Sequence, residues 1–164
     1  MIGNKKEFTK NLTKYFLDLG FEKYKDHIYY VEKAGYYIFV DLQKSNYDST
    51  SYYINYGYTV KTADQFELTT KYPRYDIRGR FIFVFHEKQT DNINFDTFDY
   101  EELDRQLNAN MEEKINPVFK KGLRNFINDN PELLNRTFYD TSRQRLENFM
   151  SHEDVKLRKG VNEN

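Results

Sequence analysis

The stretch that decides the fold runs from Ile28 to Val60 and reads IYYVEKAGYYIFVDLQKSNYDSTSYYINYGYTV. It holds three short runs of aromatic and β-branched residues, separated by the turn-forming segments KAG and SNYDST. Such runs, bounded by Gly, Asn, Asp and Ser, are typical of strands joined by tight connections. The stretch therefore predicts an antiparallel β-meander whose faces carry many tyrosines.

Four strands are expected in this meander. The first three span about His27–Glu32, Tyr36–Gln43 and Ser51–Val60, and the very apolar run Arg80–His86 is expected to be a buried fourth strand. Residues 61–75 show no clear period, so we expect a loop there with one helical turn or a weak strand.

The third run alternates between two faces of the predicted sheet. One face carries Tyr52, Ile54, Tyr56, Tyr58 and Val60, and the other carries Ser51, Tyr53, Asn55, Gly57 and Thr59. An aromatic face at this spacing is typical of a surface that helices cover, and we expect the first face to be core. The alternative is a stacking platform for single-stranded nucleic acid.

An amphipathic helix is expected before the meander. Residues 5–19 place four apolar side chains on one helical stripe, and the remaining positions are largely polar. Asn4 is a suitable N-cap, and Gly20 lies where a helix often ends in left-handed backbone. Phe21 is then expected to pack back on the helix.

Further helices are expected after the strands. Asp99 and Glu102 form a capping-box pattern ahead of a helix that runs to about Ile115. The Asn-Pro pair that follows suits a restart, so residues 117–128 form a third helix or a kinked continuation. Another helix is expected near Thr141–Met150.

This order of elements predicts an α+β fold. It consists of an N-terminal helix, a four-stranded antiparallel meander sheet, and two to three C-terminal helices packed on one sheet face. At 164 residues the chain suits one domain. We expect that domain to span residues 1–150, followed by a polar, mobile tail over 151–164.

The composition narrows the chemistry. The chain holds 15 Tyr and 14 Phe but no Cys, which excludes disulfides, thiolate nucleophiles and cysteine-ligated metals. A net charge of −1 argues against non-specific nucleic-acid binding. No apolar run suits a signal peptide or a membrane span, and we expect a cytoplasmic protein.

Four motifs give the chain a family resemblance. They are LGF at Leu19–Phe21, VDLQKSNY at Val40–Tyr47, YYINYG at Tyr52–Gly57 and DIRGR at Asp76–Arg80. In this order and spacing, over roughly residues 5–130, the chain resembles the bacterial domain-of-unknown-function family 4304. The resemblance implies an α+β bacterial domain with no assigned activity, and it does not cover the sequence after residue 131.

Two polar clusters are candidate binding sites. Gln43, Lys44 and Ser45 follow the second strand, where their donors could converge on a polar or anionic ligand, or simply lead into a loop.

The second cluster is Asp76, Arg78 and Arg80, with Gly79 between the arginines. Arginine forks bind carboxylate or phosphate, and glycine allows a partner to approach the backbone. The structural alternative is that Asp76 pairs with one arginine and fixes the entry to the fourth strand.

No catalytic constellation is apparent. His27, His86 and His152 lack metal-ligand spacing, and there is no P-loop, GxGxxG or GxSxG motif. We therefore expect no metal, no cofactor and a chain that is more a binding module than an enzyme.

The leading functional hypothesis is protein–protein interaction, in a toxin-neutralising or immunity-type role by analogy, because tyrosine is favoured at interfaces. A small-molecule or phosphate-binding pocket, or a weak enzyme built on the same polar residues, is the alternative. RNA binding is a third hypothesis, and strand pairing could also produce a homodimer.

Overall fold

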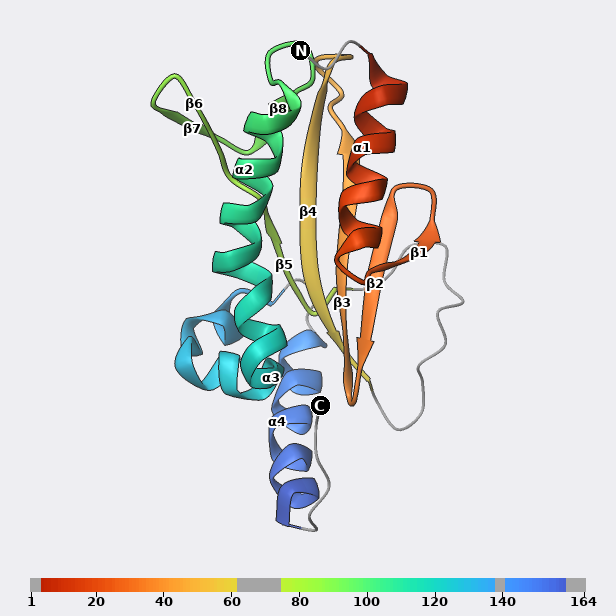
Figure 1. Cartoon of the computed structure of the whole chain (residues 1–164). Helices are drawn as coiled ribbons and strands as arrows, with labels where there is room; N and C mark the ends of the chain where they lie inside the picture. Colours follow the sequence, from red (N-terminus) through yellow and green to blue (C-terminus); the bar gives the residue numbers. More distant parts are fainter. Residues whose placement is uncertain (1–3, 62–74, 138–140, 159–164) are drawn as a thin grey trace.

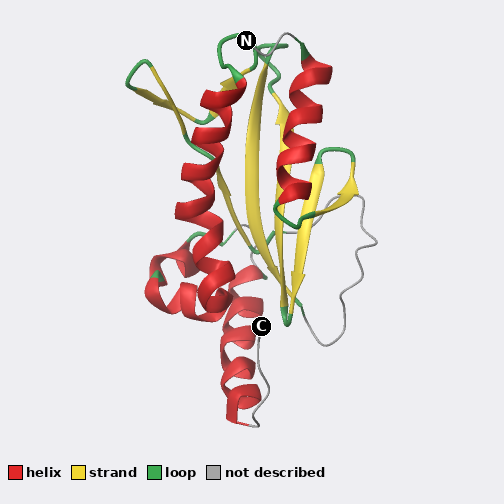
Figure 2. Cartoon of the chain, in the orientation of Figure 1, coloured by secondary structure: helices red, strands yellow, loops and turns green. Residues whose placement is uncertain are grey.

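The computed structural model describes residues 4–61, 75–137 and 141–158, with side chains described as far as Ser151. It confirms the predicted α+β class: a helix, then an antiparallel sheet, then helices (Figure 1). The helices α1 and α2 lie side by side on one face of the sheet (Figure 2). Most of the predicted loop over residues 61–75 lies outside the described residues.

The main sheet has six antiparallel strands. Five of them follow one another in the order β1 (Glu22–Lys25), β2 (Ile28–Lys33), β3 (Tyr36–Lys44), β4 (Ser51–Val60) and β5 (Ile77–Arg80). The sixth, β8 (Asn92–Asn94), pairs with the first residues of β4, on the same edge as β5. The second and third predicted strands therefore agree with β3 and β4 to within one residue.

The predicted fourth strand, Arg80–His86, is wrong in its pairing. The chain leaves the main sheet at Arg80, and β6 (Phe83–Phe85) pairs with β7 (Lys88–Thr90) in a separate two-stranded hairpin. Its two-residue turn, His86-Glu87, has positive φ at both positions, 49° and 64°. This geometry suits the right-handed twist of a hairpin. The edge of β4 is already occupied by β5 and β8, so the run pairs with the chain that follows it.

The other edge of β6 is bound by two amide side chains of α2 (Tyr100–Asn110). Asn110 accepts from the N–H of Ile82 and donates to its carbonyl, both at 2.8 Å, and Gln106 makes the same pair of bonds with Val84. Residues four apart on a helix are separated by about 6 Å, close to the ~6.6 Å between alternate strand residues. We call this pair of amides the amide clamp, and it satisfies the backbone of an edge strand that would otherwise be open.

The ends of α1 (Lys5–Asp18) are formed as the sequence predicts. Asn4 Oδ1 accepts from the Glu7 N–H at 2.9 Å. Gly20 has φ 96°, and Phe21 donates its N–H back to the Phe16 carbonyl at 3.0 Å. These bonds satisfy carbonyls that the last helical turn leaves open.

The chain continues as helix from α2 through a π-helical turn (Met111–Ile115) into α3 (Asn116–Asp129). The restart or kink predicted at Asn116-Pro117 is misplaced, because the helix is interrupted at Gly122 instead, where φ is 80° and ψ is 157°. The carbonyl of Lys114, in the π-helical turn, accepts from the Tyr58 hydroxyl at 2.5 Å.

A 3₁₀ turn (Pro131–Asn135) leads to α4 (Ser142–Arg158). This helix is longer than the predicted Thr141–Met150, so the tail expected from residue 151 begins as helix.

The core lies between the helices and one sheet face. The predicted core face of β4 is confirmed, because its alternating apolar side chains all belong to the main hydrophobic cluster with α1 and α2. Aromatic rings supply much of the contact: the Phe16 ring lies 5.5 Å from that of Tyr29, and the Phe8 ring lies 5.2 Å from that of Tyr52. Such pairs add to the stabilisation from burial alone.

Candidate functional site

Strand register assembles a polar cluster on the sheet face opposite α1 and α2. Asp41, Asn55 and Arg80 lie directly opposite one another on β3, β4 and β5. In the neighbouring rows, Gln43 is paired with Tyr53, and Arg78 is paired with Gly57. We call this surface the arginine face; its residues are Asp41, Gln43, Tyr53, Asn55, Arg78 and Arg80.

Asn55 is the centre of the cluster. Its amide nitrogen donates to Asp41 Oδ1 at 2.9 Å and to Gln43 Oε1 at 3.0 Å. Its amide oxygen accepts from Arg80 Nε at 3.1 Å. Asn55 is buried, and this one side chain ties three strands together across the face.

The two arginines converge on one oxygen. Arg78 Nη2 lies 3.4 Å and Arg80 Nη2 lies 3.5 Å from Gln43 Oε1. The Arg80 guanidinium also stacks over the Tyr53 ring at 4.0 Å and pairs with Asp91 at 2.9 Å. The exposed fractions of the Arg80 and Asp91 side chains are 36% and 46%, so this pair remains accessible to solvent.

Asp41 is held in a partly dehydrated position. Burial raises its pKa above the usual 3.8, opposed by hydrogen bonds from Tyr75 and Asn55 and by the arginine charges. The Tyr75 hydroxyl donates to Asp41 Oδ2 at 2.5 Å. The Tyr75 ring lies over Gly57, where an added Cβ would meet its Cγ at 2.6 Å.

Gln43, Arg78 and Arg80 are thus brought together, but Lys44 and Ser45 are not part of this cluster. Lys44 is exposed and, by alternation along β3, belongs to the opposite side from Gln43. Ser45 is buried, and its hydroxyl accepts from the Tyr47 N–H at 3.1 Å, which stabilises the loop after β3.

Asp76 also lies apart from the arginine face. It is fully buried and accepts from the Val60 N–H, the Ser142 hydroxyl and Arg145 Nε, each at 2.9 Å. Arg145 donates in addition to the Val60 carbonyl at 2.7 Å. Asp76 therefore has a structural role, but the predicted pairing with one of the two neighbouring arginines is wrong. Its partner is Arg145, and the carboxylate holds α4 to the end of β4.

Gly79 serves packing within the fold. An added Cβ there would lie 2.5 Å from the Tyr56 hydroxyl and 2.6 Å from Cζ of the same ring. A core tyrosine therefore occupies the space beside Gly79. The glycine makes room for that ring, whereas the sequence suggested that it lets a partner approach the backbone.

The sequence reasoning missed Asp41, Asn55 and Tyr75 as members of the cluster. A signal existed for two of them, because Asn55 alternates with the apolar face of β4, and Asp41 interrupts the apolar run of β3. Tyr75 had no such signal, because it reaches Asp41 from the segment before β5.

The cluster offers hydrogen-bond donors and an aromatic ring. Two guanidinium groups can bind a carboxylate or another anion through parallel N–H bonds. The described part of the chain shows no group of three or more His, Asp and Glu arranged to hold a metal ion. His27 and His86 lie in turns with positive φ.

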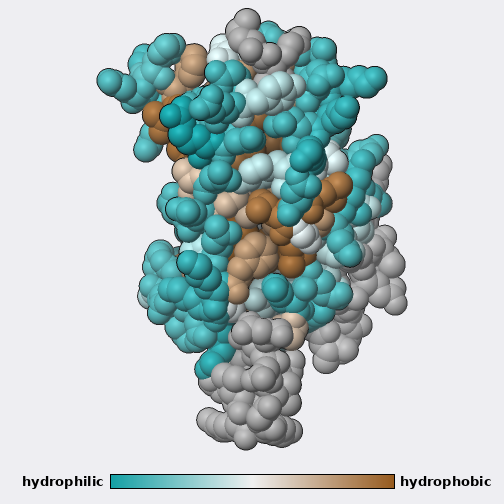
Figure 3. All heavy atoms as spheres, viewed as in Figure 1, coloured by the Kyte–Doolittle hydropathy of each residue, from teal (hydrophilic) through white to brown (hydrophobic). Residues whose placement is uncertain are grey.

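The helix side has a different surface. Apolar atoms gather near the C-terminal end of α1, and polar atoms surround them (Figure 3). Leu17 and Leu19 at this end are 44% and 46% exposed. No helix among the described residues combines the length and apolar character that crossing a bilayer requires.

Comparison with known proteins identifies the family. Residues 12–121 match the family model described as Domain of unknown function (DUF4304). No curated protein and no solved structure matches the chain. The match covers most of the chain, including the second half of α1, the main sheet and α2, and the chain therefore belongs to this family.

Proposed function

We propose that the chain is a protein-binding module whose partner contacts the arginine face. The observation that carries this proposal is the Arg80 guanidinium, stacked 4.0 Å over Tyr53 and held by Asn55. Arginine and tyrosine are enriched among the residues that dominate binding energy at interfaces. A guanidinium held in place before binding loses less conformational entropy when a partner docks.

The charges of the face suggest what the partner presents. Arg80 is already paired with Asp91 in an ion pair that solvent reaches. A partner carboxylate could take over this role and also reach Arg78, forming charge-assisted bonds within a partly dry contact. The proposed partner therefore carries an acidic side chain beside apolar surface.

A polyanion suits this face less well. Arg78 and Arg80 are accompanied by Asp41 and Asp91, so the local charges nearly cancel. Nucleic-acid binding relies on many uncompensated cations and weakens steeply with salt. Salt-sensitive retention of RNA by the wild-type protein would support RNA binding over a protein partner.

A comparative capture experiment tests the proposal. Arg78→Gln is compared with Arg105→Gln, which changes a 73% exposed arginine on α2, on the other side of the sheet. Proteins captured from the native cell by the wild type are purified, and direct affinities are measured. We expect Arg78→Gln to weaken a genuine partner by about 30-fold or more and Arg105→Gln to leave affinity unchanged. Equal affinity of both variants would refute the proposal.

The finer form of the proposal is a toxin-neutralising or immunity-type module in the cytoplasm. It is motivated by the binding character of the face and by analogy, since a fold alone does not determine a function. Its test is whether the captured partner is itself toxic when expressed alone and harmless when co-expressed with this chain.

A second candidate function is the binding of a small anion. It rests on the convergence of Arg78 and Arg80 on Gln43 Oε1 at 3.4 and 3.5 Å, which are long for hydrogen bonds. A charged oxygen near this point would bind both guanidinium groups more strongly than a neutral amide. A rise in melting temperature with phosphate or citrate that Arg78→Gln abolishes would support this candidate.

A further inference from the structure

The guanidinium of Arg80 has one edge left for a carboxylate from outside. Its Nε donates to the buried Asn55 at 3.1 Å, and its plane stacks 4.0 Å over the Tyr53 ring. A planar guanidinium binds a carboxylate through two parallel N–H bonds, either from Nε and one Nη or from both Nη atoms. Because Asn55 occupies Nε, the edge formed by Nη1 and Nη2 is the one that an incoming carboxylate can use.

Asp91 holds this edge by a single bond. Its Oδ2 accepts from Arg80 Nη1 at 2.9 Å, and among the described residues this is the one hydrogen bond that the Asp91 carboxylate makes. The other nitrogen of the edge, Nη2, lies 3.5 Å from Gln43 Oε1, which is long for a hydrogen bond. Asp91 therefore engages one half of an edge that can bind two carboxylate oxygens.

The Asp91 side chain can leave this edge while its backbone stays in place. Asp91 is the single residue between β7 and β8, and the Asn92 N–H donates across it to the Thr90 hydroxyl at 3.2 Å. The strand β8 is fixed to β4 through Ile93, which is fully buried. The Asp91 side chain itself is 46% exposed, so a change of rotamer is sufficient to move its carboxylate into water.

We propose that Asp91 is an intramolecular competitor, which occupies the carboxylate edge of Arg80 until the partner supplies an aspartate or glutamate side chain. This inference rests on the proposed function and adds to it the chemical group that is recognised and the residue that limits affinity. The partner carboxylate binds Nη1 and Nη2 of Arg80 together, close to Arg78 Nη2, which lies 3.4 Å from the same Gln43 oxygen. Two parallel charge-assisted bonds are stronger than the single bond of Asp91, so the exchange favours the partner.

The surroundings of Arg80 favour a competing role for Asp91 over a supporting one. Asn55 holds the Nε side of the guanidinium and Tyr53 covers one of its planes, so Arg80 keeps its position after Asp91 leaves. A competitor predicts that removing the Asp91 charge strengthens binding of a carboxylate. A residue that positioned Arg80 for the partner would predict weaker binding instead.

The expected gain in affinity follows from the exposure of the pair. Ion pairs that solvent reaches are formed only about two to five times more often than not. Apparent affinity is reduced by the fraction of molecules in which the competitor occupies the edge. Removing the charge also ends the repulsion between Asp91 and a second carboxylate. We therefore expect Asp91→Asn to bind a carboxylate partner about three- to tenfold more tightly than wild type.

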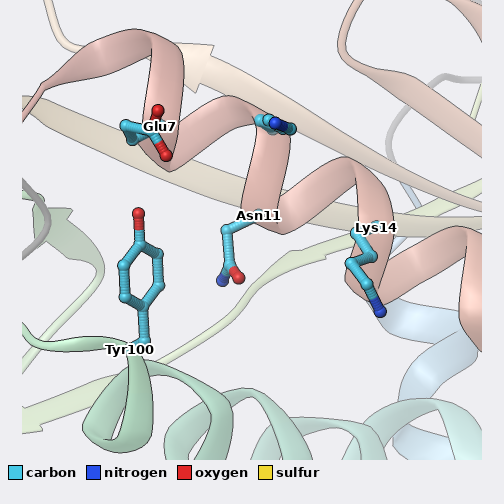
Figure 4. A pocket seen from close by; sticks show the side chains of 5 residues that line it. Glu7, Asn11, Lys14 and Tyr100 are labelled. Atoms are coloured by element: carbon cyan, nitrogen blue, oxygen red, sulfur yellow. The ribbon is translucent and has the colours of Figure 1, made fainter.

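A second group of cations, on the helix side, serves as a control. Lys10 and Lys14 line an open groove between α1 and α2 (Figure 4). Lys14 pairs with Asp18 at 2.6 Å, and the two side chains are 75% and 63% exposed. An ammonium is a point charge without a fork, so Lys14→Gln should leave recognition of a carboxylate unchanged.

The probe is the blocked peptide acetyl-Leu-Asp-Leu-amide, with acetyl-Leu-Asn-Leu-amide as its neutral counterpart. NMR of the full-length protein at neutral pH follows the Arg80 Nε–H signal, the backbone amides of residues 90–92 and the Asp91 carboxyl carbon. We expect the aspartate peptide to bind wild type with a Kd of about 1–10 mM and to shift the Asp91 carboxyl carbon more than the neighbouring amides. The charge-matched control for Asp91→Asn is Asp129→Asn, which removes a carboxylate from the half-exposed pair with Lys121 on α3.

Each outcome is decisive. Tighter binding of the aspartate peptide by Asp91→Asn, with Asp129→Asn and Lys14→Gln equal to wild type, supports the competing role. Equal or weaker binding by Asp91→Asn overturns it, as does equal affinity for the asparagine peptide or the absence of binding at about 20 mM peptide. The proposed function is judged separately by the response of the captured partner to Arg78→Gln, so it can stand when this inference fails.

Discussion

Replacing Arg145 with methionine tests how α4 is held to the sheet. Arg145→Met preserves much of the aliphatic stem and removes the guanidinium that pairs with the fully buried Asp76 at 2.9 Å. Asp76 would keep two neutral donors, the Val60 N–H and the Ser142 hydroxyl, but lose its counter-charge. The Val60 carbonyl would also lose its donor.

The expected loss follows from this geometry. Removing one partner of a buried pair leaves an uncompensated charge, which costs about 3–5 kcal/mol. The Arg145 side chain is 17% exposed, so water can reach part of the vacated space, and we expect a value near the lower end. Replacing both members by Asp76→Asn and Arg145→Met together should cost less than the sum of the single changes, because the charge then leaves with its partner.

Urea unfolding followed by circular dichroism measures these free energies. The matched control is Arg143→Met on the same helix, whose partner Glu147 lies at 3.2 Å with both side chains about half exposed. Exposed pairs of this kind contribute about 0.5 kcal/mol or less. If Arg145→Met costs no more than Arg143→Met, the inferred anchoring of α4 is incorrect.

Three further predictions concern the amide clamp, Asp41 and Gly57. Asn110→Leu should lower the free energy of unfolding by about 1–3 kcal/mol, and Gln106→Leu should lower it by less. The reason is that the backbone bound by Asn110 is less accessible to water than the backbone bound by Gln106. Urea titrations of both variants check this order. Burial raises the pKa of Asp41 above 3.8, so the folded state favours the neutral carboxyl. The stabilisation that this preference gives is fully present below pH 3.8 and is lost as the pH rises through the raised pKa. The difference in unfolding free energy between wild type and Asp41→Asn should therefore fall from about pH 3 to pH 7. A difference that grows with pH would contradict the raised pKa of Asp41. Gly57→Ala should lower the free energy of unfolding by about 1–3 kcal/mol or more, because the new Cβ would meet the Ile77 carbonyl oxygen at 2.8 Å. Gly20→Ala should cost less, because only the positive φ at that position opposes it. Thermal melts of the two variants compare these costs.

Much of the fold was predictable because local signals agree with the tertiary result. The caps at Asn4, Gly20 and Asp99 satisfy backbone groups within a few residues, so neighbouring sequence is sufficient to place them. Alternation along β4 likewise identifies its core face without knowledge of its neighbours. The Arg80–His86 run misled because its apolar composition predicts a buried strand, whereas Ile82 and Val84 are exposed and the pairing depends on which sheet edges other strands occupy.

The candidate site was predictable only in part. Gln43, Arg78 and Arg80 stand out by residue type and share one face. The role of Asn55 as their common partner depends on the register between β3, β4 and β5. Asp76 looked like a member of the same motif, but a helix more than sixty residues later supplies its partner.

Residue order alone determined both ends of α1, the start of α2 and which side of β4 is apolar, because those outcomes depend on hydrogen bonds and side-chain spacing within one element. The tertiary structure decided which distant polar groups meet: Asn55 with Arg80, and Asp76 with Arg145. Such meetings require strands and helices to be packed against one another, since burial and charge pairing act between atoms that are close in space, whatever their separation along the chain.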